Sequence, residues 1–210
     1  MSYLANQLGK SGDAQLYQKE FQKLKSSLLK TLFFQDDQQA YFKTEAGKDQ
    51  IDTVASILGA LYLLSVEDAV KVENTLAKTV KRQTGLQNFH PPYEAKDIFL
   101  PFRVIGHQDY HNRFVWPWVT AQNIQVKIKI ALEHHDFEVR ERFQQEAVAD
   151  FCQMVALFSE LGSAYEVVEP DKIEVGKTPF YTSQKDFMAS MVGFETTRKL
   201  LNKLGWIEER

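Results

Sequence analysis

The segment Phe137–Leu161 places an apolar residue at every third or fourth position. The residues on this stripe are Phe143, Ala147, Phe151, Met154, Phe158 and Leu161. This spacing matches the period of an α-helix and not the two-residue period of a strand. Gly162 follows where a left-handed C-terminal cap is expected. A long helix with one apolar face must bury that face, so this segment predicts a fold made by helix packing.

Other segments share the helical period. Residues 14–33 carry one apolar face, for which Asp13 is the expected N-cap, and residues 53–64 carry a second. Ser65 then opens a third helix, because Asp68 stands three residues later as in a capping box. The apolar residues of these three helices are Tyr17, Phe21, Leu24, Leu28 and Leu32; Val54, Ile57, Leu58, Leu61 and Tyr62; and Val72, Leu76 and Val80.

Residues 125–130 alternate between polar and apolar, which suits a strand. They continue from a stretch that Pro117 opens, and proline favours the first turn of a helix. We therefore predict a helix there. A last helix is expected to start at Ser183 or Asp186 and to end at Gly205. Its predicted face is Phe187, Met191, Phe194, Leu201 and Leu204.

Two stretches, 85–112 and 163–182, contain prolines and glycines and no clear period. Long ordered loops in compact domains are commonly functional. The sequence thus predicts an all-α single domain over residues 1–210, with six or seven helices and two long functional loops.

Composition excludes several classes of function. The net charge is -3, with no broad basic field for a phosphate backbone, so nucleic acid is not expected as a partner. The sequence has no glycine-rich nucleotide motif, and we expect no cofactor. It has no apolar run of about 20 residues, so no membrane partner is expected. The single cysteine, Cys152, and the absence of a signal-peptide pattern predict a cytoplasmic protein.

The ends of the two loops carry the candidate site. Residues 107–118 combine polar side chains with two tryptophans, a mixture that suits a polyhydroxylated ligand but also a helix start with buried rings. Glu166 lies between an aromatic residue and two valines. A carboxylate in such surroundings can act as a general base, or simply form an ion pair. His107 and His111 have a zinc-like spacing without a third ligand, so we expect no metal site.

The segment YHNRFVWPWV resembles the YHN-x-x-x-WPW pattern of bacterial glycoside hydrolases of the amylo-alpha-1,6-glucosidase and mannosylglycerate-hydrolase-like type. YEVVEPD and GKTPFYTSQKDFMAS are similar to the E-x-x-x-P segment and last helix of that family, although Gln184 and Lys185 depart from it. The resemblance implies an (α/α)6 toroid of which this chain is the C-terminal half. It assigns Glu166 as the general base, and it assigns Tyr110, His111, Asn112, Trp116 and Trp118 to the sugar pocket.

The family's general acid is an aspartate in the N-terminal half of the toroid. Asp52, Asp97 and Asp109 are available here, but none matches the motif of that acid. An inverting glycosidase needs two carboxylates about 6.5–9.5 Å apart. The resemblance therefore implies hydrolysis of an α-linked glucoside or related sugar by inversion, incomplete without the other half.

Half a toroid would expose apolar helix faces. We therefore expect a protein partner, either a separate N-terminal half or another copy of the chain. Two further interpretations stay open: a non-catalytic carbohydrate-binding or assembly module, and a helical interaction protein. The segment Tyr110–Trp118 disfavours the last of these.

Overall fold

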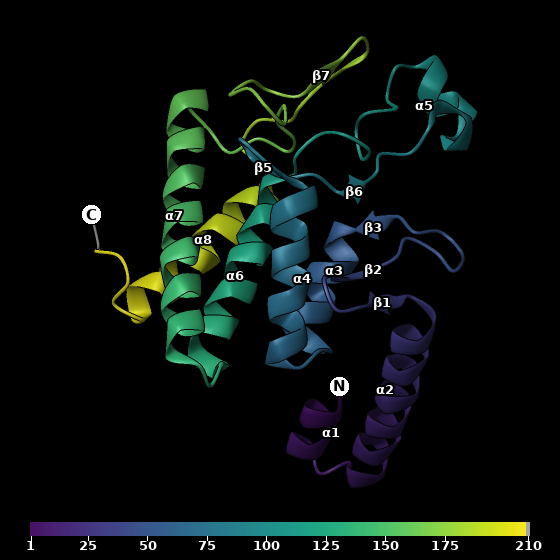
Figure 1. Cartoon of the computed structure of the whole chain (residues 1–210), viewed down its shortest axis with the longest axis vertical. Coiled ribbons are helices and arrows are strands. Elements are labelled where there is room, and N and C mark those ends of the chain that lie inside the picture. Colours follow the sequence, from purple (N-terminus) through teal and green to yellow (C-terminus); the bar gives the residue numbers. More distant parts are fainter. Residues whose placement is uncertain (209–210) are drawn as a thin grey trace.

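The computed structural model describes residues 1–208 and consists mainly of helices (Figure 1). The helices are α1 (Ser2–Gln7), α2 (Ser11–Thr31), α3 (Thr53–Tyr62), α4 (Val66–Thr79), η1 (Ala95–Asp97), α5 (Leu100–Val104), α6 (Pro117–Glu133), α7 (Phe137–Leu161) and α8 (Met188–Lys203). The strands are β1 (Phe33–Gln35), β2 (Ala40–Phe42), β3 (Ile51–Asp52), β4 (Lys81–Arg82), β5 (Gly85–Leu86), β6 (Phe89–His90), β7 (Lys177–Thr178) and β8 (Tyr181–Thr182). The strands pair antiparallel as β1–β2, β3–β6, β4–β5 and β7–β8.

Helix α6 lies at the centre of the packing, against α3, α4, α7 and α8. Its side chains are buried on several faces, including Val119, Ile124, Val126 and Ile130 at 0% exposure. This explains the alternation of residues 125–130: a helix covered from several sides carries apolar residues beyond one stripe. The prediction of a helix opened by Pro117 is confirmed.

Local signals located several helix ends correctly. Helix α7 has the predicted bounds, and Gly162 caps it with φ 70°. The Ser65 hydroxyl accepts the Asp68 N–H at 3.1 Å and lies 3.0 Å from the Asp68 carboxylate, so the predicted cap of α4 is confirmed. Gly205 also has φ 70°, just beyond α8.

Other helix starts were predicted wrongly. Asp13 lies inside the first turn of α2, which begins at Ser11 with Lys10 as the N-cap residue. Helix α8 begins at Met188, after both predicted starts. Ser183 instead accepts the Val167 N–H at 2.8 Å. Because that hydroxyl is used in a tertiary contact, it does not cap a helix.

The predicted loop 85–112 is more ordered than its sequence indicates. It contains strands β5 and β6 and the short helices η1 and α5. The loop 163–182 contains only the β7–β8 hairpin. Figure 1 shows both stretches at the same end of the molecule.

Helices α1 and α2 form an arm that projects from the opposite end (Figure 1). They pack on each other, and α2 also contacts β1. The apolar residues Tyr3, Leu4, Leu8, Leu16, Tyr17, Phe21 and Leu24 are all exposed on this arm. The predicted apolar face of α2 therefore exists but is largely uncovered.

Within residues 1–208, no helix combines the length and apolar character needed to cross a bilayer. A cytoplasmic location stays a prediction.

Candidate functional site

The two long loops are joined at one buried point. Val115 and Val168 each donate a backbone N–H to the carbonyl of the other, both at 3.0 Å, and both are fully buried. This antiparallel bridge aligns the segment before α6 with the segment after α7. It brings Tyr110 and Glu166 together although 56 residues separate them in the sequence.

The Glu166 carboxylate is held by two phenols. The Tyr110 hydroxyl donates to Oε1 at 2.6 Å, and the Tyr181 hydroxyl donates to Oε2 at 2.5 Å. The two tyrosine rings meet edge to face, with centroids 5.0 Å apart. Glu166 is half-buried, so it is neither a fully solvated loop residue nor a core residue. The Glu166 carboxylate is therefore oriented by neutral donors. The ion pair that the sequence left open as an alternative for Glu166 is not what holds it.

Both phenols remain protonated at neutral pH. Burial raises the pKa of Tyr110 well above its usual range, and the hydrogen bond to the Glu166 carboxylate raises it further. The same causes raise the pKa of Tyr181 to about 12. A phenolate beside a carboxylate would be disfavoured by like charge. The pair of tyrosines thus acts as a fixed pair of hydrogen-bond donors.

Trp116 positions Tyr110 and His111. Its indole N–H donates to the Tyr110 carbonyl at 3.0 Å, and its ring stacks on His111 with a centroid distance of 4.9 Å and an interplanar angle of 6°. Desolvation lowers the pKa of His111, while the Glu166 carboxylate opposes that shift. The imidazole is therefore neutral at pH 7, and Trp116 serves as a buried support.

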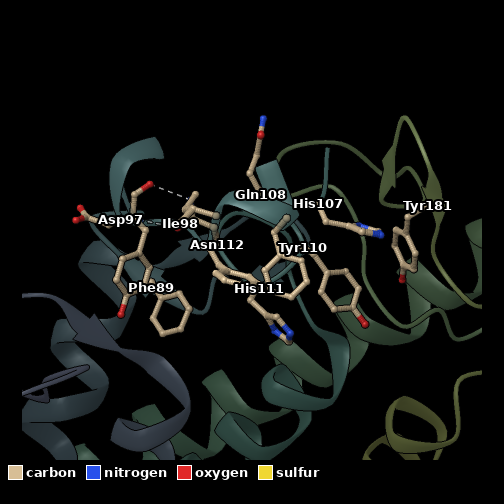
Figure 2. Close-up of a pocket in the computed structure, with 12 residues that line it drawn as sticks. Phe89, Asp97, Ile98, His107, Gln108, Tyr110, His111, Asn112 and Tyr181 are labelled. Carbon is tan, nitrogen blue, oxygen red and sulfur yellow. Dashed lines mark hydrogen bonds between the residues drawn. The ribbon is translucent and has the colours of Figure 1, made fainter. Parts of the chain in front are cut away.

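A cavity of about 490 Å³ opens beside this cluster (Figure 2). It is lined by Phe89, Tyr93, Asp97, Ile98, Phe99, Phe102, His107, Gln108, Tyr110, His111, Asn112 and Tyr181. Its size and aromatic lining are those of a small-molecule site. Glu166 is not among the lining residues. It is linked to the cavity through Tyr110 and Tyr181.

The structure places the residues of the YHN-WPW segment in different roles. Tyr110, His111 and Asn112 line the cavity, whereas Trp116 and Trp118 are not among its lining residues. The Asn112 amide accepts the Tyr93 N–H at 2.6 Å and donates to the Tyr93 carbonyl at 3.1 Å. Asn112 therefore fixes the course of the loop. Trp118 contacts the ring of Trp116 from the first turn of α6.

Sequence reasoning did not name several lining residues as site residues, although His107 and Gln108 lay in the candidate stretch 107–118. His107 lies edge to face with both Tyr110 and Tyr181, at centroid distances of 5.8 Å and 5.2 Å. Tyr181 stood in the segment GKTPFYTSQKDFMAS, which the family resemblance covered only as a whole. The concentration of Phe and Tyr in residues 89–102 was the available signal for the remaining wall.

The three aspartates considered as acids differ in position. Asp52 caps α3 by accepting the Ala55 N–H at 2.9 Å, so it is structural. Asp109 pairs with Arg113 at 3.2 Å. Asp97 lines the cavity.

The side chains of Glu67, His134 and His135 form one group that is close enough to hold a metal ion. Nδ1 of His134 already accepts the Asp136 N–H at 3.1 Å, where α6 turns into α7. In a neutral ring the proton is then on Nε2, which leaves no free lone pair for a metal. We interpret this group as part of the helix junction.

Comparison with family models finds no match, and no curated protein matches the sequence. Among solved structures, the chain is similar to part of a chain described as a sialidase, with a TM-score of 0.58 and 16% sequence identity. The match covers 96% of this chain and 18% of that chain, so this chain spans less than a fifth of the sialidase. At this identity the match shows shared fold alone, and membership of the amylo-alpha-1,6-glucosidase type stays a prediction.

Proposed function

We propose that this chain is the C-terminal portion of a glycoside hydrolase domain of the (α/α)6 type. It would act on an α-linked glucoside or a related sugar by inversion. The observation that carries the proposal is the Glu166 carboxylate, held by two protonated phenols at the end of an aromatic cavity. The match to a sialidase, itself a glycoside hydrolase, supports the same class of reaction.

Glu166 would act as the general base. Each carboxylate oxygen accepts one phenol hydroxyl and retains a lone pair for a water. That water attacks the anomeric carbon while the bond to the leaving oxygen breaks, and Glu166 takes the proton of the water. A general acid must protonate the leaving oxygen.

A hydroxylated ligand fits the polar end of the cavity. In the described residues, the buried Nδ1 of His107 has no hydrogen-bond partner. A buried polar atom left without a partner costs free energy. Because this atom is closed to water, a ligand hydroxyl reaches it only if the His107 ring rotates. His111, also in the lining, offers a second imidazole ring.

The proposal includes a protein partner that completes the toroid, either a separate N-terminal half or a second copy. The family resemblance places the general acid in that N-terminal half. The exposed apolar residues of the α1–α2 arm support a covered surface there. The short share of the sialidase chain that this chain spans agrees with further polypeptide in the complete enzyme.

A second candidate function is a non-catalytic carbohydrate-binding or assembly module. One observation favours it: Glu166 does not line the cavity, and both of its oxygens are engaged by tyrosines. In that case Glu166 only orients the two phenols.

The test compares wild type with Glu166→Gln on a panel of α-glucosides, with and without a candidate N-terminal half. The control is Glu174→Gln, an exposed glutamate on the same loop. A general base predicts activity that requires both halves, is lost in Glu166→Gln and is kept in the control. Sugar binding without hydrolysis under every condition would favour the module. Activity that survives Glu166→Gln would remove Glu166 from the mechanism.

A further inference from the structure

The cavity has two chemically different ends (Figure 2). His107, Tyr110 and Tyr181 lie at one end, beside the Glu166 carboxylate. Phe89 and Ile98 lie at the other end. The lining therefore separates a polar end from an apolar one.

Two aromatic pairs contribute to the lining of the cavity. Phe89 and Tyr93 meet edge to face at 5.1 Å, and Phe99 and Phe102 meet edge to face at 5.9 Å. Phe99 is 68% exposed and Phe102 is 49% exposed. Such large rings lose free energy when left in water, and a ligand group that covers them gains it.

Few polar groups are available at the end of the cavity that carries Phe89 and Ile98. Asn112 is buried, and each side of its amide already bonds the Tyr93 backbone, so it offers little to a ligand. Asp97 is exposed, and its carboxylate remains in contact with water. A second sugar ring would bring several hydroxyls to this wall, where the Asp97 carboxylate and the Tyr93 hydroxyl are the polar groups available, so the remaining hydroxyls would lack partners. An apolar group has no such cost.

We propose that the cavity takes a glycoside with an aryl or alkyl aglycone, whose sugar lies at the Glu166 end and whose aglycone lies against Phe89, Ile98, Phe99 and Phe102. This inference rests on the proposed function for the sugar end. It adds the class of leaving group, and it makes Phe99 and Phe102 the residues that determine specificity.

The test is calorimetric titration of the full chain with phenyl α-D-glucopyranoside, methyl α-D-glucopyranoside and benzyl alcohol. Covering one aromatic ring on one side predicts that the phenyl glucoside binds at least about tenfold more tightly than the methyl glucoside. Phe102→Ala is expected to bring that ratio close to one. The control is Phe180→Ala, which removes an exposed phenylalanine outside the cavity and should keep the ratio.

The outcomes separate this inference from the proposed function. Equal affinity for the phenyl and methyl glucosides, or a ratio that Phe102→Ala leaves unchanged, would overturn the aglycone site while sugar binding stands. Benzyl alcohol binding as tightly as the phenyl glucoside, without binding of the methyl glucoside, would support the apolar site and reject the sugar function. Failure of all three probes to bind would reject both.

Discussion

A buried ionic cluster joins helices α4, α6 and α7, and it predicts how stability depends on pH. Glu73 is 3% exposed and accepts the Asn123 side-chain N–H at 2.5 Å. Nearby, Lys127 donates to Asp150 at 2.7 Å, and Lys81 bonds the other oxygen of that carboxylate at 2.7 Å. Burial raises the pKa of Glu73 to about 7, although the Lys127 charge opposes the shift.

The direction of the effect follows from the two pKa values of Glu73, 4.5 in the unfolded chain and about 7 in the folded one. Below pH 4.5 the Glu73 side chain is protonated in both the folded and the unfolded chain, so its contribution to the free energy of unfolding has its full value. As the pH rises from 4.5 to about 7, the unfolded chain releases the proton and the folded chain keeps it. The free energy of unfolding therefore falls through this window and levels off above it. The difference between the two pKa values corresponds to about 3 kcal/mol.

Glu73→Gln tests this reasoning. Glutamine keeps an oxygen for Asn123 and cannot ionise, so the variant should gain about 3 kcal/mol relative to wild type between pH 4.5 and pH 8. The assay is urea unfolding followed by circular dichroism at several pH values across that range. Glu160→Gln, an exposed change on α7, controls for loss of a carboxylate. A constant difference between wild type and Glu73→Gln at every pH would refute the reasoning.

Other changes test the remaining contacts. Tyr181→Phe removes a hydrogen bond to Glu166 and should lower the free energy of unfolding by about 1 kcal/mol in urea titration; an unchanged value would mean that the bond contributes nothing. Gly59→Ala places a methyl group against an aromatic ring of β2 and should cost about 1–3 kcal/mol. Gly12→Ala, with open space around it in α2, should cost nothing, and equal effects of the two would contradict this packing. Leu24→Glu on the exposed arm should change stability by less than about 0.5 kcal/mol and reduce self-association in light scattering; strong destabilisation would show that the arm is covered.

Helix identity was predictable because burial follows the helical period. Both ends of α7 were located from the sequence: it runs from Phe137 to Leu161, and Gly162 adopts the left-handed cap. The first residue of a helix was less predictable, because a polar side chain can cap a helix only when it is not hydrogen-bonded in a tertiary contact. Ser183 illustrates this, because its hydroxyl accepts the Val167 N–H instead.

The site was predictable only in part. The link between Tyr110 and Glu166 was expected from a family resemblance, and spacing alone contains no trace of it. Their contact depends on the bridge between Val115 and Val168, which is a tertiary pairing. Tyr181 reaches Glu166 from the β7–β8 hairpin. The strands of that hairpin are too short to show an alternation of polar and apolar residues in the sequence.

The arrangement of the ends limits what a partner must do. Figure 1 shows the α1–α2 arm at one end of the long axis, and α5 and β7 beside the cavity loops at the other. A partner that covers only the arm would bury its apolar residues and leave the surroundings of Glu166 unchanged. A partner that supplies a general acid must reach the cavity end. Helices that run along the molecule from the arm to the cavity loops would do both, as the other half of a toroid requires. Under the proposed function, gain of hydrolysis, and not complex formation alone, is therefore the result that would identify the completing half.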